Sequence, residues 1–325
     1  MLAIDAADTM ADTDLKHGKL VGDLGGHATY YVLTEQAVQS AEILKKIQAA
    51  GHEIAYLGDR FEGFKELSTS AQIKRLDTML REMKSSGIEL AADAGFHPPM
   101  ELYDKTTEKL LTARGFGYYV AGLDASEARL PFLSPGAVAE PEAKPAKTIV
   151  VLPRTQSDPE DLLADGDPVS GLKLFLSELD LAEKMAGLSV IRISNKSTLS
   201  DVQLGAISKQ LKIKRDRMWL ATAGQVAQWW RERERVSISF DSKTVPPRLS
   251  VTIKGDKPLQ QAANVWVNLP DSGSSLRLVA AETYEKLPKI ASIDAWRASM
   301  DLNGLAPGEY HWYLYFDRAV TRVVK

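Results

Sequence analysis

Short apolar runs alternate with helical stretches from Met1 to about Arg235. Each apolar run has the length of a buried strand, and each helical stretch places its apolar residues on one side. This alternation predicts an α/β domain built in layers. The expected strands are Leu2–Asp5, Thr29–Leu33, Glu53–Tyr56, Ile88–Ala92, Tyr118–Ala121, Ile149–Leu152, Leu188–Ile193 and Met218–Ala221.

The helices between these strands are identified by their spacing and by their ends. Residues 35–50 and 70–86 each carry an apolar face and are followed by Gly51 and Gly87, which suit the left-handed position after a helix. Asp104 is placed to cap a helix that runs to Arg114. Strands alternating with helices fit either a (β/α) barrel or an open doubly wound sheet. Further helices are expected at Gly171–Ala186, Ser200–Leu211 and Gly224–Glu234.

The pattern changes after Arg235, where apolar and polar residues alternate in short runs separated by turn sequences. Alternation with a period of two is typical of strands that bury one face. About seven such runs predict a small β-sandwich over residues 236–325, and therefore a domain boundary at residue 235. Two stretches of the first domain, residues 134–147 and 158–168, are expected to be loops. The runs are Val236–Phe240, Arg248–Ile253, Ala263–Leu269, Leu276–Ala280, Ser299–Leu302, Tyr310–Phe316 and Ala319–Val324.

Composition adds little to this fold but excludes some classes of function. The net charge is -3, from 40 basic and 43 acidic residues, and no block of like charge stands out, so we expect no nucleic-acid partner. The absence of cysteine excludes disulfides, thiolate metal sites and a cysteine nucleophile. No apolar run approaches the ~20 residues that span a bilayer. The acidic start, Met1–Asp14, does not resemble a signal peptide, and its abrupt entry into a strand leads us to expect a processed or shortened chain.

Three segments carry motifs in a specific order. Gly51–Phe61 reads GHEIAYLGDRF, Gly95–Leu111 reads GFHPPMELYDKTTEKLL, and Leu188–Ser194 reads LSVIRIS before the final helix of this region. In this order and spacing they resemble the polysaccharide deacetylases, the NodB-homology carbohydrate esterases. The resemblance covers residues 1 to about 235 and implies a distorted (β/α) barrel. The following β-sandwich resembles accessory domains found in some of these proteins.

The resemblance also implies a chemistry. In the family, one Asp and the two His of a His-x-x-x-His pair hold a divalent metal, usually zinc, which polarises the acetamide carbonyl and activates water. A neighbouring Asp is the base, an Arg in the Pro-Pro loop orients it, and a His at the last strand protonates the leaving amine.

The metal-binding positions of this chain lack donor atoms. Asp5 can stand where the base stands, but Ala6 takes the position of the metal-binding Asp. Leu57 and Phe61 take the two His positions at the same separation of four residues. Because a catalytic zinc needs three protein ligands with N, O or S donors, we expect neither a metal nor another cofactor. Leu57 and Phe61 are expected to make the former metal pocket apolar.

The remaining catalytic positions are replaced as well. His97 stands in place of the orienting Arg, and Ser194 in place of the acid His. We therefore expect no catalytic residue, with Asp5 as a vestige. The old cleft keeps polar groups at its rim, and these are the expected glycan contacts: Asp5, Asp8, Asp59, Arg60, Asp93, His97, Glu101 and Tyr103.

These observations predict a catalytically degenerate deacetylase-like protein that binds a glycan or an envelope protein. By resemblance, its expected location is the bacterial envelope, periplasmic or extracellular. One alternative is an active, zinc-dependent enzyme with a relocated site, which requires acidic and His side chains such as Asp5, Asp8, Asp93 and His97 to cluster near the strand ends. Another is a purely structural assembly module, whose β-sandwich would carry an exposed aromatic patch.

Overall fold

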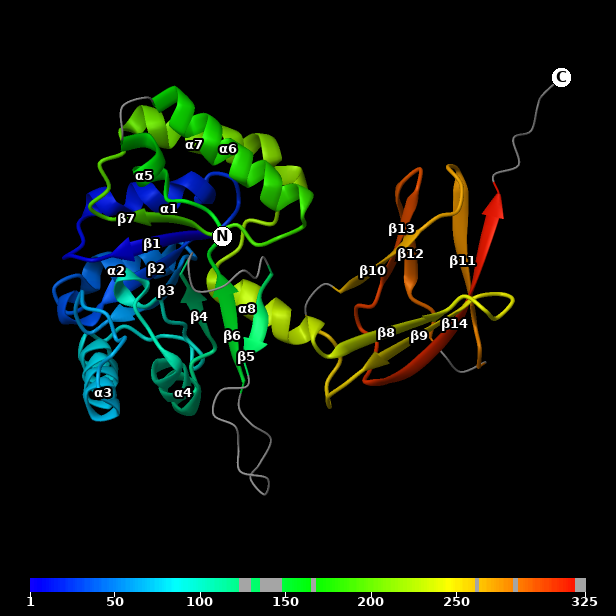
Figure 1. The fold of residues 1–325 in the computed structure, drawn as a ribbon, viewed down its shortest axis with the longest axis horizontal. Coiled ribbons are helices and arrows are strands. Elements are labelled where there is room, and N and C mark those ends of the chain that lie inside the picture. Colours follow the sequence, from blue (N-terminus) through cyan, green and yellow to red (C-terminus); the bar gives the residue numbers. More distant parts are fainter. Residues whose placement is uncertain (123–129, 135–147, 165–167, 261–262, 283–285, 319–325) are drawn as a thin grey trace. The chain divides into compact units, whose positions relative to one another are not determined.

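The computed structural model describes residues 1–122, 130–134, 148–164, 168–260, 263–282 and 286–318. The chain divides into two compact units, unit 1 (Met1–Ala227) and unit 2 (Gln228–Lys325) (Figure 1). Within the described ranges, no helix has both the length and the apolar character needed to cross a lipid bilayer.

A largely parallel arrangement of strands forms the centre of unit 1. Four strands pair in the order β3-β2-β1-β7, and β4 pairs in parallel with β6, whose other neighbour β5 is antiparallel. Phe96 connects the two groups, because it bridges Tyr56 of β3 and Tyr119 of β4. The strands are β1 (Leu2–Ala6), β2 (Thr29–Leu33), β3 (Glu53–Gly58), β4 (Tyr118–Ala121), β5 (Phe132–Ser134), β6 (Ile149–Pro153) and β7 (Ile191–Ser194).

Helices lie around these strands and cover their apolar side chains. The mixed α/β class expected from the sequence is confirmed. Asp104 caps its helix as predicted, since its side chain accepts the Thr107 N–H at 2.9 Å, and Gly115 ends that helix at φ 86°. The α-helices are α1 (Leu15–Gly22), α2 (Ala41–Ala49), α3 (Thr69–Ser85), α4 (Lys105–Arg114), α5 (Pro159–Ala164), α6 (Pro168–Lys184), α7 (Asp201–Lys214) and α8 (Ala223–Arg233), and the 3₁₀ turns are η1 (Asp12–Asp14), η2 (Thr34–Gln36), η3 (Pro99–Glu101) and η4 (Arg215–Arg217).

Two predicted strands of unit 1 are wrong. Residues 88–92 form no strand, although Ile88 is buried in the core, and the residues around it are partly or fully exposed. Phe96 takes the pairing position between β3 and β4 instead. Residues 218–221 are also not a strand, and Trp219 among them is more than half exposed. In both segments a short apolar run was therefore not enough to identify a strand of the sheet.

Several other boundaries differ from the sequence-based expectation. The stretch 158–168 contains α5, whose first residue Pro159 and acidic first turn are features of a helix start. Residues 35–50 form η2 and α2 rather than one helix, and α1 and β5 were not predicted. Of the expected loop 134–147, only Ser134 is described, and it ends β5.

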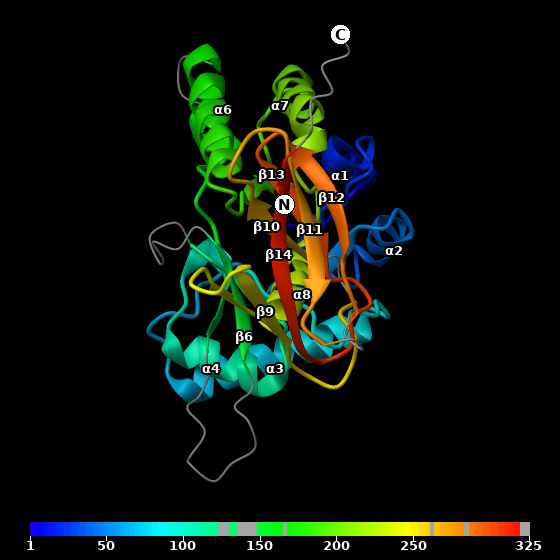
Figure 2. The same ribbon diagram turned by 90° about the vertical axis from the view of Figure 1, so that its right-hand side faces the viewer.

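Unit 2 contains two antiparallel sheets that share one apolar core. One sheet has the order β10-β13-β12 and the other β11-β14-β9-β8, with β14 (red) running along unit 2 in Figure 2. Trp312 and Met300, one from each sheet, are both fully buried in this core. The strands are β8 (Val236–Asp241), β9 (Arg248–Ile253), β10 (Asn264–Asn268), β11 (Ser274–Ala280), β12 (Lys289–Asp294), β13 (Arg297–Asp301) and β14 (Gly308–Arg318).

The alternation of apolar and polar residues located most strands of unit 2. β12 was not predicted from the sequence. All six of its residues are exposed, so the strand has no buried face that an alternation of apolar and polar residues would mark. The expected strand 319–324 lies outside the described residues.

Candidate functional site

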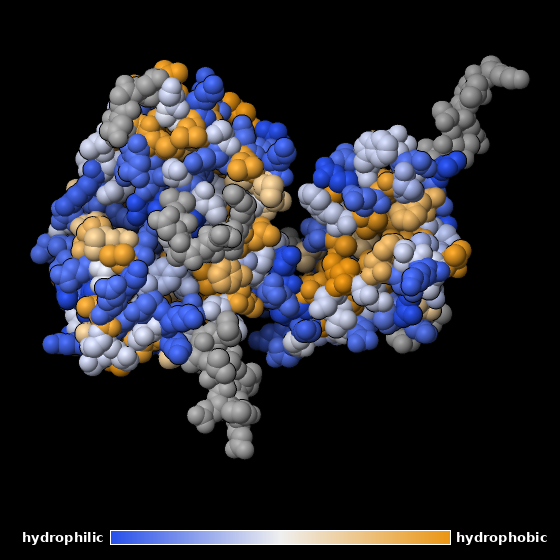
Figure 3. All heavy atoms as spheres, viewed as in Figure 1, coloured by the Kyte–Doolittle hydropathy of each residue, from blue (hydrophilic) through white to orange (hydrophobic). Residues whose placement is uncertain are grey.

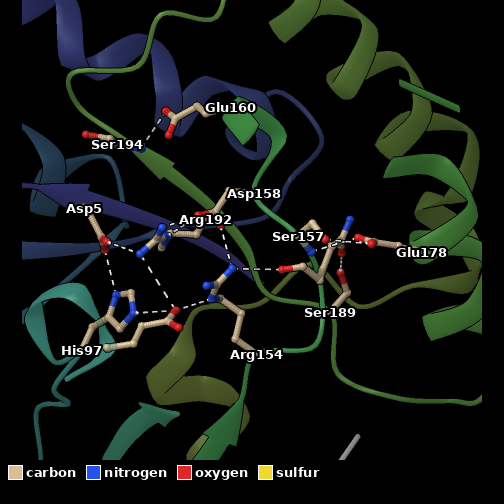
Figure 4. A network of polar contacts seen from close by, with 12 residues as sticks. Asp5, His97, Arg154, Ser157, Asp158, Glu160, Glu178, Ser189, Arg192 and Ser194 are labelled. Atoms are coloured by element: carbon tan, nitrogen blue, oxygen red, sulfur yellow. Dashed lines mark hydrogen bonds and ion pairs between the residues drawn. The ribbon is translucent and has the colours of Figure 1, made fainter. Parts of the chain in front are cut away.

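Charged side chains meet at the carboxyl ends of the strands in unit 1, which is where parallel α/β folds place their sites. Asp5 comes from β1, Arg192 from β7, and Arg154 follows β6 directly. His97 and Glu101 belong to the loop after Phe96, and Asp158 precedes α5. We call the six side chains the polar network, and they are Asp5, His97, Glu101, Arg154, Asp158 and Arg192 (Figure 4).

His97 and Asp5 form one end of the network. The Nδ1 atom of His97 lies 2.9 Å from Asp5 Oδ1, and its Nε2 atom faces Glu101 Oε1 at 3.8 Å. His97 is fully buried, and its ring packs edge-on against Tyr31 with centroids 5.1 Å apart. Burial opposes the charged imidazolium, but the nearby carboxylates, Asp5 above all, outweigh it and raise the pKa of His97.

Two arginines hold the other end of the network. Arg154 donates from Nε to Glu101 and from Nη1 to Asp158 Oδ1 at 2.9 Å. Arg192 donates from Nε to Asp158 Oδ2 at 2.8 Å. The Nη1 atom of Arg192 also lies 3.8 Å from Asp5 Oδ2 and 3.9 Å from Glu101 Oε1. Arg192 therefore links three carboxylates.

The charges of the network balance when His97 is protonated. Three carboxylates then face two guanidinium groups and one imidazolium. Burial opposes ionisation of Glu101, yet His97 and Arg154 hold its pKa well below the usual range. For Asp158, burial prevails over Arg192 and Arg154 and raises the pKa. A compensated cluster of this kind stabilises buried charge without a bound ion.

The loop that carries Glu101 has an unusual backbone. Met100 and Glu101 both adopt left-handed conformations, at φ 55° and 58°. Such strain in non-glycine residues is concentrated at functional sites. Gly122 makes room for Glu101, since a Cβ at Gly122 would lie 2.4 Å from Glu101 Oε2. The fold thus places the Glu101 carboxylate at a defined point between His97 and Arg154.

The network contains some predicted site residues and leaves others apart. Asp5, His97 and Glu101 are brought together as described. Asp8 is exposed and pairs with Lys196 at 2.9 Å, and Asp93 is also exposed, so these two carboxylates do not join His97 in a relocated metal site. Ser194 lies at the end of β7, where its backbone N–H donates to Glu160 at 3.0 Å (Figure 4).

Asp59 and Arg60 hold a loop together. Asp59 is buried and accepts from Arg75 Nε at 2.8 Å and from Arg60 Nη1 at 2.9 Å. Arg75 also donates to carbonyl oxygens of the same loop, including that of Gly63 at 2.6 Å. The Asp59 carboxylate is therefore used inside the protein, and only Arg60, about half exposed, reaches solvent.

Arg154, Asp158 and Arg192 were not predicted as site residues. Arg192 is a charged residue inside the apolar run of β7, and Arg154 follows the apolar run of β6 without a gap. A charge at either position of a buried strand requires a partner at the strand end. That feature of the sequence could have identified both arginines.

The residues present do not fit the zinc ion that the resemblance to the deacetylases implies. Ala6 and Leu57 are buried hydrocarbon side chains, whereas Phe61, the other residue expected to make this position apolar, is about half exposed. The imidazole of His97 and the carboxylate of Asp5, next to Ala6 in the chain, already bind each other. In the described part of the chain, no three His, Asp or Glu side chains form a group that could hold a metal ion.

His97 should make the stability of unit 1 depend on pH. Because its pKa is raised above the ordinary value of about 6.5, its contribution is fully present below that pH and is lost as the pH rises through the folded-state pKa. We expect the stability difference between the wild type and His97→Gln to shrink between about pH 6 and pH 9. Urea unfolding followed by circular dichroism measures this difference, and a difference constant over that range would contradict the assigned charge.

Comparison with known proteins identifies the fold of unit 1. No protein-family model and no curated protein sequence matches the chain. Among solved structures, a protein from Mycobacterium smegmatis described as a polysaccharide deacetylase is 20% identical over 72% of this chain and 91% of that chain, with a TM-score of 0.54. A protein of the same description from Pseudomonas aeruginosa PAO1 is 14% identical over 71% and 89%, also at 0.54. Puue allantoinase is 14% identical over 71% and 89%, at 0.53.

The chain thus has the fold of the polysaccharide deacetylases, and the resemblance expected from its motifs is confirmed at that level. An allantoinase shares the fold, so the fold alone does not specify a carbohydrate substrate.

Proposed function

We propose that this chain is a non-hydrolytic protein of the polysaccharide deacetylase fold and that it binds a glycan beside the polar network. The observation that carries the proposal is that Ala6, Leu57 and Phe61, at the metal positions, have no donor atoms. Asp5, the retained base position, is bound by His97. In the family's chemistry the base acts on a water that a metal ion activates, and hydrocarbon side chains at the metal positions cannot hold that ion.

A cavity next to the network supports the choice of a glycan. Its volume is about 460 Å³, within the range of small-molecule sites. Glu101 and Tyr103, two of the predicted contacts, line it together with Glu108 and the exposed side chain of Met100. Tyr103 packs on Tyr119 with ring centroids 5.1 Å apart, which fixes its orientation. An oriented aromatic ring beside carboxylates is suited to a sugar, which offers both a C–H face and hydroxyl groups.

The finer assignments belong to the same proposal. We take unit 1 as a distorted (β/α) barrel and unit 2 as an accessory β-sandwich, with residue 235 as the functional boundary. By analogy with proteins named for polysaccharide deacetylation, we place the chain in a bacterial polysaccharide or cell-envelope system. A protein partner there is the alternative ligand.

The absence of hydrolysis is tested first. We expect the purified protein to carry no stoichiometric zinc by mass spectrometry and to release no acetate from chito-oligosaccharides, because the metal positions offer no donors. Stoichiometric metal, together with acetate release that Asp5→Asn abolishes, would establish the active-enzyme alternative instead.

Glycan binding is tested next, on a glycan array followed by calorimetry with the best oligosaccharide. Tyr103→Ala is expected to lower the affinity at least about tenfold. Phe61→Ala is the matched control, because Phe61 is an exposed aromatic residue of unit 1 outside the cavity. Equal binding by both variants would count against this cavity.

A further inference from the structure

The outer face of the sheet β10-β13-β12 in unit 2 carries an exposed tryptophan. On β10, Val265 is buried in the core while its neighbour Trp266 is 62% exposed. The residues across from Trp266 are small, since it pairs with Ser299 of β13, which in turn pairs with Ala291 of β12. The indole therefore stands above a flat face with no large side chain opposite it.

Trp266 is held in place by charged neighbours. The guanidinium of Arg297 lies over the ring, 5.2 Å from its centroid. Arg297 in turn pairs with Asp294 at 2.6 Å, which limits its freedom. An exposed aromatic ring that is already oriented loses little conformational entropy when a ligand packs on it.

Polar side chains flank the indole in regular positions. Asn264 and Asn268 lie two residues before and after Trp266, on the same face of β10 and about 14 Å apart. Asp301 pairs with Asn264 across the sheet, so an amide and a carboxylate lie together at one side of the ring. The amide of Asn264 can both donate hydrogen bonds to hydroxyls and accept them, and the carboxylate of Asp301 can accept them.

The face continues into a groove of the same unit. A cavity of about 510 Å³ is lined by Asn264 and Trp266 on the sheet and by Trp229 and Glu232 at the end of α8. Glu232 fixes this helix end, because it accepts the Gln260 N–H at 2.9 Å and pairs with Arg235 at 2.7 Å. Figure 3 shows hydrophobic residues exposed beside hydrophilic ones on unit 2. Two tryptophans thus border one groove, which is lined by apolar side chains such as Val236 and Ile238 and by charged side chains at the end of α8.

We propose that this face and groove bind an uncharged stretch of polysaccharide. One pyranose ring packs its C–H face on Trp266, with hydroxyls bonded to Asn264 and Asp301, and the chain continues toward Trp229. An uncharged ligand is favoured because each arginine here has a carboxylate partner, Arg297 with Asp294, Arg235 with Glu232 and Arg233 with Glu234, which leaves no arginine free to attract a polyanion. This site is separate from the cavity in unit 1 and does not rest on it.

The test uses calorimetry of the full chain with chitohexaose and cellohexaose as probes. We expect binding of at least one probe, with Trp266→Ala weakening it at least about tenfold and Trp266→Phe retaining part of it. Trp219→Ala is the control, because Trp219 is similarly exposed, at 55%, but belongs to unit 1. Far-ultraviolet and near-ultraviolet circular dichroism verify that each variant is folded.

Three results would overturn the proposal. The first is that the wild type binds neither probe, and the second is that Trp266→Ala binds as tightly as the wild type. The third is that the wild type is a concentration-dependent dimer that Trp266→Ala converts to a monomer, because the face would then be an interface between copies. Loss of binding with Tyr103→Ala but not with Trp266→Ala would leave the unit 1 proposal standing and refute this one.

Discussion

Replacing Arg154 by methionine is expected to destabilise unit 1 by about 3–5 kcal/mol at neutral pH. The Arg154 side chain is only 6% exposed and lies between Glu101 and Asp158, which are 15% and 3% exposed. It also donates to the Gln156 carbonyl at 3.1 Å. Removing this cation leaves two buried carboxylates and a carbonyl without their shared donor, and an uncompensated buried charge costs more than the ion pair contributes.

The pH dependence distinguishes this effect from a general loss of packing. Glu101, whose pKa is lowered in the wild type, contributes stability that is present above its ordinary pKa of about 4.5 and is lost as the pH falls below it. In Arg154→Met the pKa of Glu101 rises, so the variant carries a neutral carboxyl there at low pH. The gap in stability should therefore narrow between about pH 7 and pH 4.

Urea unfolding followed by far-ultraviolet circular dichroism measures this gap. The signal reports mainly on unit 1, because the described helices lie there except for the last residues of α8. Arg154→Lys should lose less, since it retains the charge but not the two-sided hydrogen bonding. Arg217→Met, at a mostly exposed position, serves as the control. If Arg154→Met unfolds at the same urea concentration as the wild type at pH 7, Arg154 does not stabilise unit 1 as described.

Phe96→Ala is expected to destabilise unit 1 by a similar amount, about 3–5 kcal/mol. Phe96 is fully buried, and its ring meets those of Phe64 and Phe116 at centroid distances of 5.4 Å and 6.2 Å. Its backbone also connects the two groups of strands by bridging Tyr56 and Tyr119. Truncation leaves a cavity where Phe96 joins the two groups of strands, directly before His97 in the chain.

The same unfolding experiment tests Phe96 with two comparisons. Phe96→Leu should cost less, because it refills part of the cavity, and Phe61→Ala should cost little, because Phe61 is exposed. Tryptophan fluorescence follows unit 2 in parallel, since five of the six tryptophans lie there. A loss of the unit 2 transition in Phe96→Ala, or no change in unit 1, would count against this account.

The sequence predicted strands best where burial and pattern agree. β2 and β9 have their predicted bounds, because each follows a simple rule, an apolar run in β2 and strict alternation in β9. The expected strand 88–92 is wrong although Ile88 is buried and Leu90 packs on the core, because the pairing position between β3 and β4 is taken by Phe96. Pairing depends on partners distant in sequence, which a local pattern does not contain.

Some features of the candidate site were likewise predicted from the sequence, and others were not. The motif positions identified Asp5 and His97, and the sequence alone established that Ala6, Leu57 and Phe61 lack metal-binding atoms, because the donor atoms of a side chain follow from its identity. The sequence did not indicate that Asp59 is bound internally by Arg75, since the contact joins a loop to a helix 16 residues away.

Residue identity thus determined the class of fold and the absence of metal ligands at the motif positions, because both depend on local pattern and on atoms within single side chains. Only the tertiary structure decided that Arg154, Asp158 and Arg192 complete a balanced network around Asp5 and His97. Charges compensate one another through space over a few ångströms, and the strand order of the sheet sets those distances.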